Sequence, residues 1–253
     1  MPFVLAVANQ KGGVGKTTSA VNLAASLAQK KHTVLLVDLD PQGNATSSLG
    51  IDKARATRTI YDVLRGAAHM SDIVLPTAQD RLFVAPARPD LAQAEIDLVS
   101  VQGREFVLRR ALESADADIV IIDCPPALGL LTVNALSSAD GVLIPVQAEY
   151  FALEGLGQLM QTIQQVRKGL NPNLEIFGVL LTMYSKRMVL SEQVQQELKS
   201  HFGDVLFKTV VPRNIRLAEA PSFGKTIFEH DKWSRGARAY KAVATEVAKR
   251  VGI

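Results

Sequence analysis

The chain has 253 residues, of which 47% are hydrophobic and 21% are charged, with 28 Lys and Arg, 25 Asp and Glu, and one cysteine. This length and hydrophobic content are enough to bury one large core, and a single cysteine excludes an internal disulfide and agrees with a reducing compartment. No run of about 18 apolar residues and no basic-then-apolar leader occurs, so the sequence favours neither a membrane span nor export and predicts a cytoplasmic protein.

The first predicted elements are a buried strand at residues 3–8 and a helix at residues 17–29. Between them, residues 11–18 read Lys-Gly-Gly-Val-Gly-Lys-Thr-Thr, in the strand, loop, helix context of a phosphate-binding loop. Its glycines let the backbone wrap an anion, so that N–H groups and the helix N-terminus converge on phosphate oxygens. The residues predicted to bind the nucleotide here are Lys11, Gly12, Gly13, Val14, Gly15, Lys16, Thr17 and Thr18.

Two lysines flank the glycines of this loop. Lys16 is predicted to neutralise the β- and γ-phosphates, and the Thr17 hydroxyl to ligate Mg²⁺. Position 10 is Gln, so the strict Gly-x4-Gly-Lys-Thr spacing is not met, and the loop has the deviant Walker A pattern Lys-Gly-Gly-x-Gly-Lys-Thr/Ser instead. A lysine such as Lys11 at a loop mouth is ordinarily only solvated, but a second cation beside Lys16 is stabilising only where a strongly anionic ligand binds.

The next apolar run, residues 33–38, ends in acidic residues. Asp38 lies near the strand end and Asp40 opens the following loop, at the carboxyl edge where parallel sheets bind ligands. One division of roles has Asp38 supporting the Mg²⁺ shell while Asp40 orients or deprotonates the attacking water. A lone Asp after a strand also serves as a turn former or helix N-cap, and for Asp38 this alternative stays open.

In a third predicted strand, residues 118–123, four apolar residues deliver Asp123 to the sheet edge in the Walker B arrangement, in which the carboxylate holds a metal-bound water. Pro125 and Pro126 stiffen the exit from the strand and remove two N–H donors. Cys124 is predicted to serve only in packing. Any strand can end in Asp before a proline turn, so this motif indicates a nucleotide site only together with the loop at residues 11–18.

Helices are predicted at residues 156–168, 191–202 and 236–251, each with apolar residues at helical spacing. The last helix carries one apolar stripe, made of Tyr240, Val243, Ala244, Val247 and Val251. Because the stripe has no Leu, Phe or Trp, it would bind a membrane only weakly. The preferred prediction is that it docks onto the core.

Residues 207–211 predict a further strand, and Pro212-Arg-Asn214 follows it. A proline presents a rigid apolar edge to adenine, and the Asn214 amide can pair with its donor and acceptor together. Base recognition by Pro212 and Asn214 is therefore one prediction. A turn that simply ends the strand is the alternative.

Positive charge is concentrated near the C-terminus. Residues 181–253 hold 13 basic and 7 acidic residues, against 15 and 18 in residues 1–180. A basic end is often only a solvated surface, but on one face of a dimer it would form the footprint of a phosphate-backbone binder. The candidate DNA contacts are Lys186, Arg187 and Arg216, and the patch is extended by Arg213, Lys225, Lys232, Arg235 and Arg238. No helix-turn-helix, zinc or RNP-type signature accompanies them, so binding to backbone and not to bases is predicted.

Four segments, residues 9–18, 37–44, 121–126 and 211–222, together resemble the ParA/Soj-type chromosome or plasmid partitioning ATPases. They span nearly the whole chain in the expected order, without a large insertion. The resemblance implies an α/β fold: a single-domain P-loop NTPase over residues 1–253, with a mostly parallel twisted sheet flanked by helices on both faces. It also implies ATP and Mg²⁺ as cofactors, and hydrolysis to ADP and phosphate that is slow without a partner.

In that family ATP drives a sandwich dimer that binds DNA non-specifically, and a ParB/Spo0J-type centromere-binding protein stimulates hydrolysis and release. The resemblance implies the same homodimer and partners here, no membrane partner, and a cytoplasmic, nucleoid-associated location. It further implies that Lys11 reaches phosphates bound by the partner subunit and that Arg187 and Arg216 bind DNA. The expected site has Lys11, Lys16, Asp40 and Asp123 in catalysis and Thr17, Asp38 and Asp123 at the metal.

Other classes share this loop. A membrane-associated positioning ATPase of the MinD type is the alternative function. A metabolic ligase-like or metal-transporting ATPase would need a carboxylate-substrate pocket or thiol ligands, and the single cysteine and the basic C-terminal third argue against it. The nitrogenase iron protein needs two cluster-ligating cysteines per subunit, and this chain has one cysteine.

Overall fold

A seven-stranded sheet forms the centre of the computed structural model, which describes residues 1–149 and 156–253. The strand order is β3-β4-β2-β5-β1-β6-β7, and every neighbouring pair is parallel except β3 with β4. The strands are β1 (Phe3–Val7), β2 (Val34–Asp38), β3 (Leu75–Pro76), β4 (Leu82–Ala85), β5 (Ile119–Asp123), β6 (Gly141–Gln147) and β7 (Glu175–Thr182). The predicted α/β class with a mostly parallel sheet is confirmed.

The central strands are apolar because helices cover both of their faces. All five residues of β2 and of β5 are buried. In the register of the sheet, Asp123 is the partner of Val7 on one side and of Asp38 on the other. The carboxyl ends of β1, β2 and β5 therefore meet at one edge, where ligands of open parallel sheets bind.

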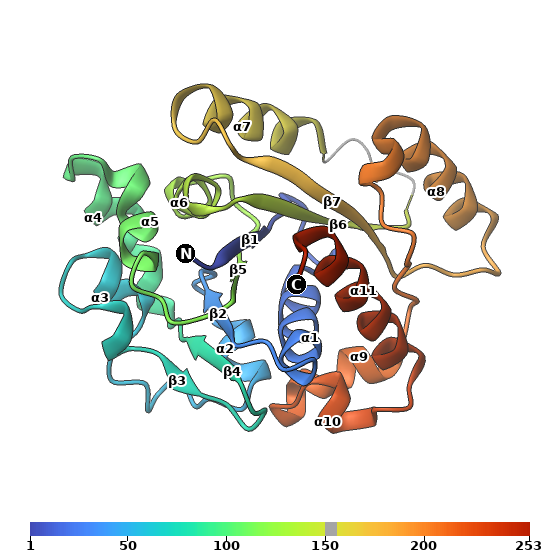
Figure 1. Cartoon of the computed structure of the whole chain (residues 1–253), viewed down its shortest axis with the longest axis horizontal. Coiled ribbons are helices and arrows are strands. Elements are labelled where there is room, and N and C mark those ends of the chain that lie inside the picture. The colour runs from blue at the N-terminus through green and yellow to red at the C-terminus, as the bar shows by residue number, and fades with distance from the viewer. Residues whose placement is uncertain (150–155) are drawn as a thin grey trace.

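Helices cover the two faces of the sheet with separate cores. One core joins the sheet to α1, α10 and α11, and the other joins it to α3, α5, α6, α7 and α8. In Figure 1, α1, α9, α10 and α11 gather on one side of the strands. The helices are α1 (Lys16–Gln29), α2 (Asn44–Ser48), α3 (Ile60–Leu64), α4 (Ala94–Asp97), α5 (Val107–Leu112), α6 (Leu130–Ser138), α7 (Leu156–Gly169), α8 (Val189–Phe202), α9 (Ile215–Glu219), α10 (Ile227–Asp231) and α11 (Arg235–Val251).

Helix α11 docks onto the core, as the sequence predicted. Tyr240, Val243 and Val247 of its stripe are buried, and the Tyr240 hydroxyl lies 3.0 Å from the Ser19 hydroxyl of α1. The stripe is therefore occupied by packing against α1 and is not a free membrane anchor. Within residues 1–149 and 156–253, no helix combines the length and apolar content needed to cross a bilayer.

The prediction of a strand at residues 207–211 is wrong. This segment lies beside β7 and is joined to it by isolated hydrogen bonds, from the Phe207 N–H to the Val179 oxygen and from the Val211 N–H to the Leu181 oxygen. Between them, the N–H groups of residues 208 and 209 donate to the carboxylate of Glu246 on α11, at 3.1 and 3.3 Å. The Glu246 carboxylate thus binds N–H groups that a continuous strand would need for hydrogen bonds with β7.

Candidate functional site

The loop after β1 has the shape of a phosphate cradle. Gly13 and Gly15 have φ of +75° and +90°, a left-handed conformation that glycine adopts without strain. A Cβ at Gly13 would meet nothing within 4 Å, so the mouth of the loop is open. The loop is held from behind, because the Asn9 amide donates to the Pro145 oxygen at 2.7 Å and the Thr182 hydroxyl lies 2.8 Å from the Val14 oxygen.

Lys16, the first residue of α1, is buried in this loop. Its Nζ donates to the backbone oxygen of Lys11 at 3.1 Å. Burial lowers the pKa of Lys16, and the nearby carboxylates of Asp123 and Asp40 act in the opposite direction. The ammonium is thus held inside the loop, where a phosphate would compensate for its lost hydration.

Asp123 is a buried carboxylate whose two oxygens receive no hydrogen bond of normal geometry from the residues that the structure describes. Burial raises its pKa well above the ordinary value and the charge of Asp38 adds to the increase, while the contact with the Thr17 side chain acts in the opposite direction. An unpartnered buried carboxylate is costly unless a cation or a bound water satisfies it. Its position beside Lys16 and Thr17 therefore fits a Mg²⁺ site completed by phosphate oxygens, which is how proteins commonly hold this ion.

Asp38 differs from Asp123 because its oxygens are already engaged. Oδ2 accepts from the Thr46 N–H at 2.8 Å and from the Thr46 hydroxyl at 2.6 Å, and Oδ1 accepts from the Asp40 N–H at 3.3 Å. The Thr46 hydroxyl also accepts from the Ala87 N–H at 3.0 Å, which ties α2 to the end of β4. Asp38 thus has the turn-forming role that the sequence left open, and support of the Mg²⁺ shell stays a prediction.

We expect the stability of the nucleotide-free protein to contain a contribution from Asp38 that falls as the pH rises. Burial raises the pKa of Asp38 from 3.8 to about 6. Because the folded state binds this proton more tightly than the unfolded state, the contribution is complete below pH 4 and is lost as the pH rises through about 6. Two pH units correspond to roughly 3 kcal/mol.

The measurement is chemical unfolding of wild type and Asp38→Asn between pH 4 and 8. The asparagine keeps an acceptor for Thr46 and cannot ionise, so the stability of this variant relative to wild type should increase with pH across this window. Groups that do not interact with Asp38 cancel in the difference between the two proteins. Asp123 does not cancel, because the charge of Asp38 raises its pKa, and its contribution changes the difference in the same direction. A difference that is constant with pH would contradict a raised Asp38 pKa.

Asp40 is buried at the start of the loop after β2. Its Oδ1 accepts from the Gln42 N–H at 2.9 Å, which fixes the turn that leads to α2. The charge of Asp40 acts on both Lys16 and Asp123, so its carboxylate shares their electrostatic environment. The structure therefore brings together the loop and all three predicted acidic residues at one edge of the sheet.

Lys11, the second lysine of the loop, is paired within its own chain. Its Nζ lies 3.2 Å from the carboxylate of Glu149, and both side chains are partly exposed. Glu149 lies just beyond the end of β6, and its other oxygen accepts from the side-chain amide of Gln147, the last residue of that strand. An exposed ion pair of this kind contributes only about 0–1 kcal/mol, so Lys11 can exchange Glu149 for another anion at little cost.

A cavity of about 360 Å³ lies beside the phosphate loop, between Gly15 and Thr18 on one side and residues 211–218 on the other. Pro212 and Asn214 line it, and Tyr240 of α11 contributes an aromatic wall. This size and lining suit a nucleotide base. The Asn214 Oδ1 already accepts from the Leu217 N–H at 3.3 Å as the cap of α9, so the amide is held in place by its oxygen.

The predicted DNA contacts lie on neighbouring segments. Lys186 and Arg187 are exposed between β7 and α8. Tyr184, at the start of this loop, pairs with Pro212 by backbone bonds, which brings the loop beside the segment that leads to α9. Arg216 is exposed on α9, and its guanidinium is paired with Glu219 at 2.9 Å and with Asp231 at 3.7 Å.

Four residues of the site were not predicted as site residues from the sequence: Thr46, Glu149, Thr182 and Tyr240. Thr46 holds Asp38, Glu149 pairs with Lys11, Thr182 supports the loop and Tyr240 lines the cavity. Thr182 ends the apolar run of β7, and this position is the one local signal for its role. The other three act through contacts that no local pattern encodes.

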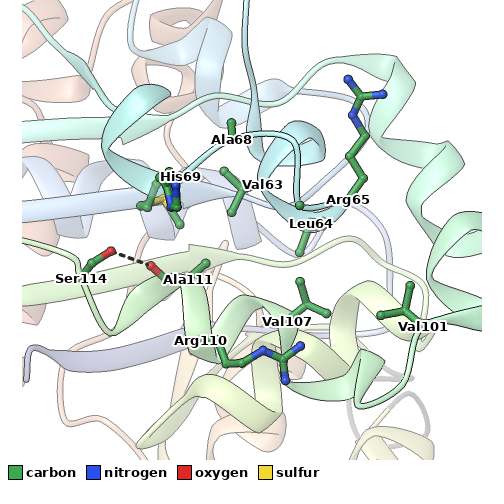
Figure 2. A pocket seen from close by; sticks show the side chains of 12 residues that line it. Val63, Leu64, Arg65, Ala68, His69, Val101, Val107, Arg110, Ala111 and Ser114 are labelled. Atoms are coloured by element: carbon green, nitrogen blue, oxygen red, sulfur yellow. Dashed lines mark hydrogen bonds between the residues drawn. The ribbon is translucent and has the colours of Figure 1, made fainter.

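A second cavity, of about 390 Å³, shares no lining residue with the first. Figure 2 shows apolar side chains of α3 and α5, among them Leu64 and Val107, between Arg65 and Arg110. Arg65 is paired with Asp62 at 2.9 Å, and Arg110 donates to the Gly103 oxygen. This cavity is therefore separate from the nucleotide site.

Comparisons with known proteins give relatives over nearly the whole chain. A family model described as an AAA domain matches residues 3–176. The chain is 52% identical over 249 residues to the chromosome partitioning protein ParA of Myxococcus xanthus, covering 98% of this chain and 88% of that protein. It is 53% identical over 247 residues to the chromosome-partitioning ATPase Soj of Thermus thermophilus, covering 98% and 96%.

Solved structures share the fold. The chain is similar to cobyrinic acid a,c-diamide synthase from Mycobacterium smegmatis, solved with a bound ATP analog and magnesium. The TM-score is 0.86 at 38% sequence identity, and the match covers 100% of this chain and 98% of that one. Proteins with different described activities thus share this fold. The sequence identity of this chain is higher with the two partitioning proteins than with the synthase.

Proposed function

This chain belongs to the ParA/Soj family of chromosome-partitioning ATPases, and from that premise we propose that it is an ATP-dependent dimerising switch of DNA segregation. ATP closes a homodimer, the dimer binds DNA non-specifically, and a ParB/Spo0J-type centromere-binding protein stimulates hydrolysis and release. The protein then acts in the cytoplasm, on the nucleoid. The observation that carries the proposal is the open glycine loop with two lysines, facing three carboxylates at the adjoining strand ends.

The site residues have distinct roles in this proposal. Lys16 and the loop N–H groups bind the phosphates, and Thr17 and Asp123 hold Mg²⁺, with Asp38 supporting them through the sheet edge. Mg²⁺, when bound, neutralises charge on the phosphate oxygens. Asp40 orients or deprotonates the attacking water, and Pro212 and Asn214 contact the base.

The DNA-binding part of the proposal is supported by exposed cations. Lys186, Arg187 and Arg216 are exposed, and the first two lie on a loop tied to the α9 segment. Arg216 is paired with two carboxylates, which compete with a DNA phosphate for it. Binding through such contacts is sequence-independent and weakens as the salt concentration rises.

Lys11 is the residue that links nucleotide to dimer in this proposal. In a single chain it pairs with Glu149, and in the dimer it exchanges that partner for phosphates bound by the other subunit. Both contacts are charge-assisted, but water screens the exposed Glu149 pair more than a contact with phosphate enclosed between two subunits, so the contact with phosphate is stronger. ATP therefore favours the exchange. Departure of the γ-phosphate and its charge after hydrolysis reverses it.

We expect Lys11→Ala to weaken ATP-dependent dimerisation by about tenfold or more, the value of one charge-assisted bond. Nucleotide affinity should change by no more than about fivefold, because the Glu149 pair that is lost within the chain is exposed. DNA binding should fall together with dimerisation. Size-exclusion sizing, nucleotide titration and DNA binding with ATP and with ADP measure the three effects.

Glu149→Gln is the matched control, because it releases Lys11 from its partner without removing the cation. This variant should dimerise as well as wild type or up to about fivefold better. Equal loss of nucleotide binding, dimerisation and DNA binding in Lys11→Ala would mean that Lys11 acts only within its own chain. An ATP-loaded wild type that stays monomeric would contradict the proposed switch itself.

A further inference from the structure

Trp233, the single tryptophan of the chain, is held on an ordered turn with its ring in solvent. The side chain is 79% exposed. Its backbone N–H donates to the Asp231 Oδ1 at 3.1 Å, and the next residue, Ser234, caps α11 by accepting from the Ala237 N–H at 3.1 Å. An indole usually gains free energy from burial, so one that is exposed on a turn with a hydrogen-bonded backbone is a candidate for ligand contact.

One cation lies over this ring, and the stretch of chain that carries the ring is basic. The Lys232 Nζ lies 5.4 Å from the ring centroid of Trp233. The Asp231 carboxylate that holds the Trp233 backbone through Oδ1 also pairs through Oδ2 with Arg216, at 3.7 Å. Asp231 therefore connects the backbone of Trp233 to Arg216, which is proposed to bind DNA. Over residues 213–241 the chain has seven basic and three acidic residues.

Other large apolar side chains are exposed on the same stretch. Ile215 and Phe223 are 75% and 63% exposed. The Phe223 ring stacks on His230, with centroids 5.1 Å apart and planes 26° apart, so one of its faces is occupied. Trp233 has no aromatic stacking partner among the described residues and is contacted by the Lys232 ammonium, which a phosphate can attract away.

We propose that Trp233 stacks on a nucleic-acid base that is unpaired or unstacked when the basic surface around Arg216 engages DNA. The inference rests on the proposed DNA binding and adds to it a contact with a base. Cations recognise phosphates, but the uncharged face of an indole is matched by the face of a base, and such stacking tolerates any sequence. Binding then keeps its lack of sequence preference and gains a part that salt does not screen.

The same ring suits a lipid interface less well. An amphipathic helix binds an interface through a continuous apolar stripe, and the stripe that the sequence offers, on α11, is buried against α1. The exposed apolar residues near Trp233 come from separate short elements and alternate with charged residues. Nucleic acid is therefore the ligand that the charge and the aromatic face favour together.

Because Trp233 is the only tryptophan, its intrinsic fluorescence reports on this one position. The ATP-loaded protein is titrated with a single-stranded oligothymidylate, with a duplex of the same length, and with vesicles containing phosphatidylglycerol. Stacking predicts quenching by DNA, stronger for the single strand, and unchanged emission with vesicles. Increased and blue-shifted emission with vesicles would overturn the inference in favour of a membrane contact.

Variants separate stacking from charge. Trp233→Ala should weaken single-strand affinity about fivefold or more at every salt concentration, leaving the log-log salt slope unchanged, and Trp233→Phe should restore part of the loss. Arg216→Ala should instead reduce the magnitude of the slope by about 0.7 on single strands and 0.9 on duplex. Thermal unfolding checks that each variant is folded.

The possible failures are distinguishable. If labelled DNA binds the ATP form but neither Trp233 emission nor Trp233→Ala affinity changes, the inference is overturned and the proposed DNA-binding switch stands. A Trp233→Ala variant that changes only the salt slope would also overturn it, because the residue would then act through Lys232. If no DNA binds the ATP form at all, both the inference and the proposed function fail.

Discussion

Asp40→Ala is expected to lower the rate of ATP hydrolysis by about 10²- to 10⁴-fold, the usual contribution of a general base. Nucleotide binding should persist, because Lys16 and the glycine loop are left intact. The ATP-bound dimer should therefore accumulate and stay on DNA. Single-turnover hydrolysis, together with sizing and DNA binding in ATP, measures this combination.

Asp40→Asn is the matched control for this prediction. The Asp40 Oδ1 accepts from the Gln42 N–H, and asparagine keeps that acceptor while losing the charge. If Asp40 deprotonates the water, both variants should be inactive in hydrolysis. If it only orients the water, Asp40→Asn should retain much of the rate. Normal hydrolysis by Asp40→Ala would contradict both roles.

Lys16→Ala should raise the dissociation constant for ATP by about 100-fold or more, because it removes charge-assisted bonds to phosphate worth about 3 kcal/mol. It also removes the bond to the Lys11 oxygen, which helps to close the loop. Dimerisation and DNA binding should both be lost with the nucleotide. Titration with a fluorescent ATP analogue measures the affinity directly.

Lys11→Ala provides the comparison. Lys11 belongs to the same loop, but its side chain is partly exposed and paired with Glu149. The two variants should differ by about tenfold or more in ATP affinity, with Lys16→Ala the weaker binder. Lys16→Ala that still binds ATP within about twofold of wild type would mean that the loop is not the phosphate site, given the size of the bond removed.

Local sequence determined the central strands and the loop after the first of them. Apolar runs fully buried in a parallel sheet must be rich in Val, Ile and Leu, so β1, β2 and β5 were predicted within one residue of their observed bounds. The loop was equally predictable, since its glycines are required by its left-handed backbone. Parallel pairing then placed Asp38 and Asp123 side by side.

Tertiary structure decided the partners of these residues. Lys11 pairs with Glu149, 138 residues away, and Glu246 takes the backbone donors that a regular strand after Phe207 would need. Asp231 joins Arg216 to the turn that exposes Trp233. A local pattern shows which face of an element is apolar. It does not show which distant side chain will pack against that face.

The sequence by itself therefore determined the nucleotide loop and the edge of the sheet that serves it. Only the folded chain decided which of its charges are paired and which aromatic ring remains in solvent, because both depend on contacts between segments far apart along the chain.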